Sequence, residues 1–187
     1  LPDASHPVDI LCDPYNETWV LGAGIGKDTG TLLHLDATGK SIHTISDIPM
    51  PGMLAMDADD NIWFSYGANR LRKISRKTHR RVHDMELGQK YPPPYNFISA
   101  IEGLASDLEG NILVIQNLDK KLYLVNGSDP FAKINEIDIP TRSPNNRVQA
   151  YGDWSGGRWI NKFGRGAAYN IPGKYREIVT SSSEFRI

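Results

Sequence analysis

The amino-acid sequence predicts an all-β fold, and three observations support this prediction. A pattern of about 45 residues occurs four times, short apolar runs alternate with turn residues, and no segment has a sustained helical period. The 12 prolines and 17 glycines are distributed along the chain, which disfavours long helices. With 187 residues, the chain is long enough for one domain with a sizeable core.

The repeat is clearest at an aspartate that is followed six residues later by a large apolar residue. These pairs are Asp13 with Trp19, Asp57 with Trp63, Asp107 with Leu113, and Asp153 with Trp159. Successive aspartates are 44, 50 and 46 residues apart. The repeats cover approximately residues 6–48, 49–97, 98–143 and 144–187, and the fourth follows the pattern only around its aspartate and tryptophan.

Each repeat is typical of about four short strands joined by turns. In the first repeat, the runs are Ile10–Cys12, Trp19–Leu21, Leu32–Leu35 and Ser41–Ile45. A turn at residues 36–39 ends in glycine, which tolerates the positive φ that tight hairpins need. Four units of this kind predict a β-propeller over residues 1–187, either four-bladed or a segment of a larger ring.

Two of the repeats also resemble a known family. The stretches "LAMDADDNIWFSYGANRLRKIS" (54–75) and "IEGLASDLEGNILVIQNLDKKLYLVN" (101–126) are similar to blades of the NHL-repeat and virginiamycin B lyase-like propellers. The resemblance covers about three quarters of the chain and implies the propeller fold. It leaves the function open, because this fold is used by lyases, lactonases, sensors and binding modules. Such propellers usually have six or more blades, so the resemblance leaves two alternatives: a compact four-bladed ring, or part of a longer chain or assembly, with which the leucine at position 1 is consistent.

Composition narrows the range of partners. The net charge of about −1 gives no overall field that recruits nucleic acid, so a nucleic-acid partner is not expected. The longest apolar runs have four to six residues, which argues against membrane insertion. Cys12 is the only cysteine, so we expect no intramolecular disulfide and treat it as a small core residue. The compartment is not identified by the sequence, although an extracellular or periplasmic one is favoured.

The acidic run at residues 57–61 invites comparison with a calcium-binding loop. An EF-hand loop needs glycine at its sixth position and glutamate at its twelfth, where this chain has Ile62 and Ala68. The position of Asp57 in the repeat favours a turn in which the carboxylate caps backbone N–H groups. We therefore predict no metal site here and no cofactor.

Two segments are candidate binding surfaces. Residues 70–83 carry seven Lys or Arg and two His, which makes Arg70, Arg72 and Lys73 candidates for a polyanion or an acidic partner. The alternative is a pair of solvated outer strands, because strand alternation puts Lys73 on the opposite face from the two arginines. The second segment is "YPPPYNF" (91–97), a stiff connection in which Tyr91 and Tyr95 are candidate contacts for a protein or carbohydrate.

An enzyme of this fold would need polar side chains from several blades to meet in the central channel, where related lactonases and lyases bind a divalent metal. Glu102, at the start of an inner strand, is the one weak catalytic candidate. Asp9 and Gln149 occupy similar positions in other repeats, but Met53 interrupts the series. The leading hypothesis is thus a non-catalytic recognition or structural module. The alternatives are a lyase- or lactonase-like enzyme and a polyanion-binding module, which heparin retention would identify.

Overall fold

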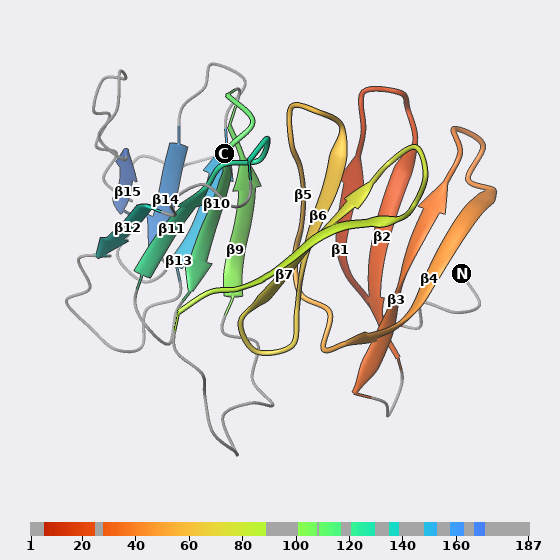
Figure 1. Ribbon diagram of the computed structural model, residues 1–187, viewed down its shortest axis with the longest axis horizontal. Coiled ribbons are helices and arrows are strands. Elements are labelled where there is room, and N and C mark those ends of the chain that lie inside the picture. The colour runs from red at the N-terminus through yellow and green to blue at the C-terminus, as the bar shows by residue number, and fades with distance from the viewer. Residues whose placement is uncertain are drawn as a thin grey trace, which may run out of the picture. The chain divides into compact units, whose positions relative to one another are not determined.

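The structure is a computed structural model, and the residues that it describes form β-strands joined by turns (Figure 1). It describes residues 6–24, 28–88, 101–107, 109–116, 121–129, 135–138, 148–152, 158–162 and 167–170. The chain divides into two compact units. The first comprises Leu1–Met56 and Asp60–Ile101, and the second comprises Asp57–Asp59 and Glu102–Ile187. Among the described residues, no helix is long and apolar enough to cross a membrane.

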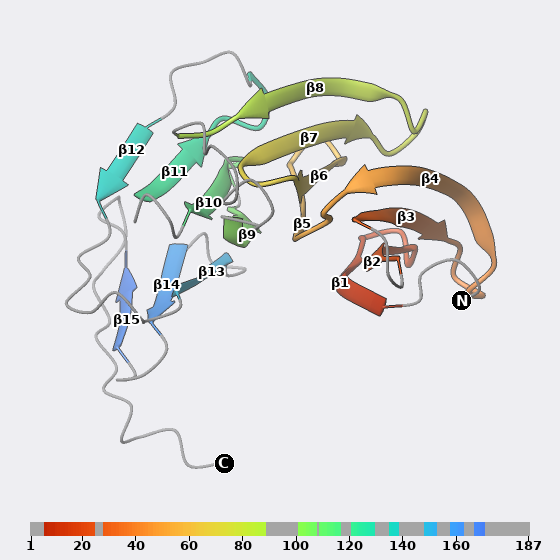
Figure 2. The same cartoon turned by 90° about the horizontal axis from the view of Figure 1, so that it is seen from below.

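The first unit contains two four-stranded sheets. The first sheet has the strand order β1-β2-β3-β4, and all its neighbours are antiparallel (Figure 2). Its strands are β1 (His6–Cys12), β2 (Thr18–Ala23), β3 (Thr29–Leu35) and β4 (Ser41–Pro49). The second sheet has the order β5-β6-β7-β8 and is antiparallel in the same way. Its strands are β5 (Leu54–Met56), β6 (Asn61–Tyr66), β7 (Arg70–Ser75) and β8 (Arg81–Glu86).

The second unit contains two further sheets. One has the order β12-β11-β10-β9, and the other has three described strands in the order β13-β14-β15. The strands of the first are β9 (Ile101–Ser106), β10 (Ile112–Gln116), β11 (Lys121–Val125) and β12 (Asn135–Asp138). Those of the second are β13 (Val148–Gly152), β14 (Arg158–Lys162) and β15 (Ala167–Asn170). Sheets of consecutive antiparallel strands, one for each repeat, are the blades of a propeller, so the predicted fold class is confirmed.

The core of the first unit comes from strand alternation. On β2, Trp19 and Leu21 point to one face and join Leu32 and Ile48 in a buried cluster with residues of the second sheet. The contributions of that sheet are Leu54, Ile62, Phe64, Tyr66 and Ile74. Trp63, next to Ile62 and Phe64 on β6, is also fully buried, as predicted for a blade-core residue.

Cys12 differs from the prediction. It is exposed at the end of β1, together with Ile10, which has 63% of its surface accessible. Strand β1 is the edge strand of its sheet, and residues two apart on a strand share a face. This face points away from the residues that pack against the second sheet. The prediction that Cys12 is a small core residue is therefore wrong.

The repeated spacing is explained, in the first three blades, by the turn after the first strand, where an aspartate accepts backbone hydrogen bonds. Oδ1 of Asp13 accepts from the amides of Tyr15 and Glu17, both at 2.9 Å. Oδ1 of Asp57 accepts from the amide of Asp59 at 3.0 Å. Asp107 makes the same kind of contact with two following amides. The predicted capping turn at Asp57 is confirmed.

Candidate functional site

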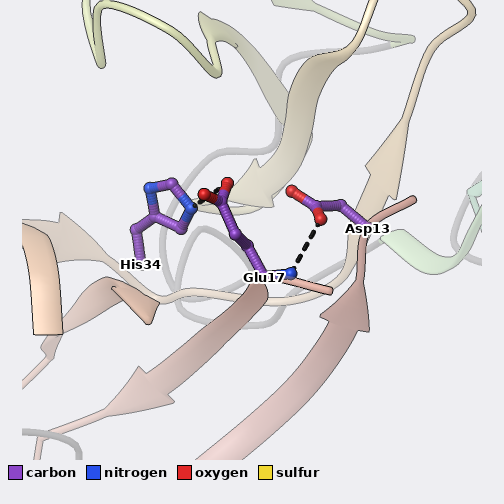
Figure 3. A group of neighbouring side chains, drawn as sticks. All are labelled: Asp13, Glu17 and His34. Atoms are coloured by element: carbon purple, nitrogen blue, oxygen red, sulfur yellow. Dashed lines mark hydrogen bonds and ion pairs between the residues drawn. The ribbon is translucent and has the colours of Figure 1, made fainter. Parts of the chain in front are cut away.

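Ionisable and aromatic side chains gather in the first unit, around the β1–β2 and β7–β8 turns, with further members on β2, β3 and β4 and in the β5–β6 turn. We call this group the polar cluster. Its members are Asp13, Tyr15, Glu17, Trp19, His34, His43, Asp60, Arg76 and His79. Asp13 follows β1, Glu17 precedes β2, and His34 lies near the end of β3. The side chains of Glu17 and His34 point toward each other, and Asp13 lies beside them (Figure 3).

His34 is the buried centre of the polar cluster, with only 3% of its surface exposed. Its ring stacks on the indole of Trp19, with ring centroids 3.8 Å apart and an interplanar angle of 11°. Nε2 lies 3.0 Å from Oε2 of Glu17, and Nδ1 lies 2.9 Å from Nε2 of His79. Because an ionised carboxylate only accepts hydrogen bonds, we assign the proton of neutral His34 to Nε2. Nδ1 is then an acceptor, and His79 Nε2 donates to it.

His79 lies in the turn between β7 and β8 with an unusual backbone conformation. Its φ is 56°, in the left-handed region, which is uncommon for residues other than glycine but enriched in Asn, Asp and His. Its amide donates to the carbonyl of Ser75 at 2.8 Å, and its ring stacks on that of His43 with centroids 4.2 Å apart. Burial, followed by the nearby His43 and His34, lowers the pKa of His79 below its ordinary value of 6.5.

Arg76 supplies the positive charge of the polar cluster. Its guanidinium donates to Glu17 Oε2, and Nη1 lies 3.9 Å from Asp13 Oδ2. It also lies over the ring of Tyr15, 3.8 Å from the centroid. The hydroxyl of Tyr15 donates to Asp60 Oδ2 at 2.6 Å, and this hydrogen bond raises the pKa of Tyr15. The cluster thus joins the two sheets of the first unit through charge-assisted hydrogen bonds.

One trio of the cluster has the spacing of metal ligands. The candidate ligand atoms of Asp13, Glu17 and His34 lie within 4.8 Å of one another. The guanidinium of Arg76 already lies against both carboxylates, so a hard cation would have to displace it. In addition, Asp13 Oδ1 accepts two backbone hydrogen bonds within the turn, and Oδ2 accepts one from the indole N–H of Trp19 at 3.4 Å. This arrangement fits a cation that the protein supplies itself rather than a divalent metal.

Glu102, the weak catalytic candidate, lies in the second unit on β9, the edge strand of its sheet. The residue is half-buried, and its Oε2 atom is buried without a hydrogen-bond partner among the described residues. Burying an acceptor in this way costs free energy unless a donor or cation reaches it. Among the residues at similar positions in other repeats, Asp9 accepts from the amides of Ile10 and Leu54, at 2.9 and 2.7 Å.

The three basic candidates on β7 have different surroundings. Arg70 is exposed. Arg72 makes a bidentate ion pair with Asp84, at 2.7 and 3.0 Å, and lies over the ring of Tyr66. Lys73 is 4% exposed, and its Nζ lies 5.4 Å from the ring centroid of Trp63. The strand alternation that separates Lys73 from the two arginines is thus observed, and only Arg70 presents its charge openly to solvent.

Tyr91 and Tyr95, the candidates in the proline-rich connection, lie outside the described residues. The polar cluster was missed by sequence reasoning, because His34 and His79 are offset by one residue between their repeats, 21 positions after Asp13 and 22 after Asp57. A signal for it exists in the spacing. The pairs His34–His79 and Tyr15–Asp60 are each 45 residues apart, close to the 44-residue interval between the first two repeats. Neighbouring blades meet at such offsets, so a search for polar pairs one repeat apart would have found both.

Comparisons with known proteins identify the fold. The chain is similar to the crystal structure of virginiamycin B lyase from Staphylococcus aureus, with 17% identity and a TM-score of 0.65, over 97% of this chain and 56% of that one. It is similar to the WD40 β-propeller domain of Doa1, with 13% identity and a TM-score of 0.59, over 82% and 47% of the two chains.

It is also similar to an auxiliary nutrient-binding protein from Bacteroides ovatus, with 10% identity and a TM-score of 0.62, over 90% and 39%. No family model and no curated protein matches the chain. The chain spans about half the length of the lyase structures that it matches. The resemblance to virginiamycin B lyase-like propellers is therefore confirmed at the level of the fold.

Proposed function

We propose that the chain is a non-catalytic β-propeller module that binds a protein or carbohydrate partner through the loops of its blades. The observation that supports this proposal is the mutual pairing within the polar cluster. Glu17 is held by Arg76 and His34, and Asp13 caps its own turn. A general acid or base has to reach a substrate, whereas these groups stabilise the joint between two sheets.

The comparisons are compatible with this role, because their functions differ while their fold is shared. One structure is described as a lyase, one as a WD40 domain and one as a nutrient-binding protein. A fold with such different uses provides a rigid scaffold, and its loops determine what it binds. We place the contacts of this chain at Tyr91 and Tyr95, with Arg70 as a further candidate.

The test begins with affinity capture, followed by binding measurements with the purified partner or a glycan array. Replacing Tyr91 and Tyr95 together by Ser should weaken binding at least tenfold, because aromatic side chains dominate contact energies. The control is Ile42→Ser, which changes an exposed apolar residue on β4. Equal affinity for the wild type and the double variant would contradict the assignment of these tyrosines. Turnover of a substrate by the purified chain would contradict the non-catalytic role.

Glu102 favours a second candidate function, a lyase- or lactonase-like enzyme. The observation is its buried carboxylate oxygen, which lacks a hydrogen-bond partner among the described residues. A divalent metal is expected in such an enzyme, but the described side chains do not assemble a ligand set. Both oxygens of Asp9 accept backbone hydrogen bonds, and Met53 offers no carboxylate. Mg²⁺-dependent turnover of lactones or esters that Glu102→Gln abolishes, while Glu109→Gln retains it, would establish this alternative.

A further inference from the structure

We propose that His34 and His79 form a two-histidine site for a divalent transition-metal ion, and that Ni²⁺ and Cu²⁺ fit it best. The two facing nitrogens, His34 Nδ1 and His79 Nε2, lie 2.9 Å apart. An ion bound by both nitrogens replaces their hydrogen bond and lies to one side of the line between them, about 2.0–2.1 Å from each. Imidazole ligands suit divalent transition-metal ions, and the affinity of nitrogen sites for these ions rises along the first row to Ni²⁺ and Cu²⁺.

The surroundings of His34 are those of a metal ligand. A ligating histidine typically donates its other N–H to a carboxylate, which fixes the tautomer and increases the basicity of the free nitrogen. Glu17 accepts from Nε2 at 3.0 Å and so leaves the lone pair of Nδ1 facing His79. The stack on Trp19, at 3.8 Å between centroids, holds the plane of the ring.

The turn that carries His79 fixes the position of its ring. The residue has a φ of 56°, and its amide donates to the carbonyl of Ser75 at 2.8 Å. This backbone conformation brings the ring to His34. When a metal ion binds, the hydrogen bond between the two rings breaks, neutral His79 loses the proton on Nε2 and takes one up on Nδ1, and Nε2 coordinates the ion. The half-buried ring exchanges this proton with solvent, so no net proton is released.

The charges near the two histidines differ. Asp13 and Glu17 carry two negative charges near His34, and Arg76 balances one of them. Arg76 also disfavours positive charge at His79, so the net negative charge lies on the His34 side of the site. Because the metal ion enters on the Nδ1 side of His34, it leaves the pairing between Arg76 and Glu17 in place. The proposed site shares His34 with the acidic trio but uses its other ring nitrogen. The described protein atoms provide two ligands, and water completes the coordination.

Isothermal titration calorimetry with NiCl2 tests the proposal, on tag-free protein at pH 7.5. A Cys12→Ser background removes the exposed thiol, which also binds such ions. We expect one Ni²⁺ per chain and no heat from MgCl2. His79→Asn should weaken Ni²⁺ binding at least tenfold, and asparagine tolerates the left-handed φ of the turn. Glu17→Gln should weaken binding by about 10–100-fold through its effect on His34. The control His83→Asn removes a histidine on β8 and should change the affinity less than twofold.

A second measurement keeps the proposal testable if a variant unfolds. The electron paramagnetic resonance spectrum of the wild-type protein with one equivalent of Cu²⁺ should show coupling to two imidazole nitrogens. A spectrum with a single coupled nitrogen would overturn the proposal. Unchanged Ni²⁺ affinity in folded His79→Asn would also overturn it, since binding would then arise from other histidines. Neither result depends on whether the chain is a recognition module.

Discussion

The guanidinium of Arg76, in the turn after β7, donates a hydrogen bond to the carboxylate of Glu17, which precedes β2. The two residues are 59 positions apart and belong to different sheets of the first unit. The accessible fractions of their side chains are 13% and 24%, so water screens the pair only in part. Such a pair stabilises the joint between sheets more than an exposed ion pair would.

We predict that Arg76→Met lowers the free energy of unfolding by about 1–3 kcal/mol, because Glu17 and Asp13 lose their charged donor in a half-buried setting. Urea denaturation followed by tryptophan fluorescence measures the change. The control is Arg81→Met, which breaks an ion pair with Asp84 at 3.2 Å in which the arginine is 68% exposed. That variant should cost less than about 1 kcal/mol. Equal losses in the two variants would show that burial does not strengthen the Arg76 pair.

Trp63 provides a test of the blade core. It is fully buried on β6, so Trp63→Ala should lower the free energy of unfolding by about 3–5 kcal/mol through lost burial and the cavity left behind. Val82→Ala is the control, since Val82 is 53% exposed on β8 and its truncation should change stability by less than about 0.5 kcal/mol. A loss below about 1 kcal/mol for Trp63→Ala would mean that its cavity refills or that it contributes little to the core.

The fold was predictable because the repeat encodes it locally. The spacing from Asp13 to Trp19 places a turn-capping carboxylate and a core aromatic on one strand connection, and the spacing from Asp57 to Trp63 repeats it. Such contacts join residues close in sequence, so a single chain reveals them. Strand lengths were less accurate. The predicted strand Ile10–Cys12 is only the end of β1, which begins at His6. The prediction was too short because the first residues of the strand lack a clear alternation of apolar and polar side chains.

The polar cluster was not predictable in the same way. His34 and His79 meet only because two blades pack together. The third and fourth repeats have no histidine at the corresponding positions, so the repeat pattern does not mark this contact. Arg72 and Lys73 belong to a run of basic residues that predicted a binding surface. In the structure, Arg72 pairs with Asp84, and Lys73 lies over the ring of Trp63. Which charges face solvent depends on the partners that tertiary packing brings.

Arg72 offers a prediction about side-chain geometry rather than charge. Its guanidinium pairs with both oxygens of Asp84 and lies 4.8 Å from the ring centroid of Tyr66. Lysine keeps the charge but loses the bidentate pair and the stacking, so Arg72→Lys should cost about 1 kcal/mol. Arg70→Lys, at the exposed start of the same strand, should be neutral. Thermal unfolding of the two variants measures the difference, and we expect a lower melting temperature for Arg72→Lys. Similar melting temperatures would indicate that only the positive charge of Arg72 contributes to stability.

The hairpin turn at Asp36 yields a prediction about pH. Oδ1 of Asp36 accepts from the hydroxyl of Thr38 at 2.6 Å and from the amide of Lys40 at 2.9 Å, and these bonds lower the pKa of Asp36 below 3.8. The unfolded chain therefore takes up the proton at higher pH than the folded one. The stabilisation is present above about pH 3.8 and is lost as the pH falls through the folded pKa.

Thr38→Val removes the largest cause of this shift, so the pKa of Asp36 should move back toward 3.8. Titration of the Asp36 carboxyl carbon by NMR measures the midpoint directly, in the wild type and in the variant. Thr78→Val, in the turn after β7, is the matched control and should leave the midpoint of Asp36 unchanged. If Thr38→Val also leaves it unchanged, the backbone amides alone lower the pKa, and the turn keeps its stability in acid without the hydroxyl.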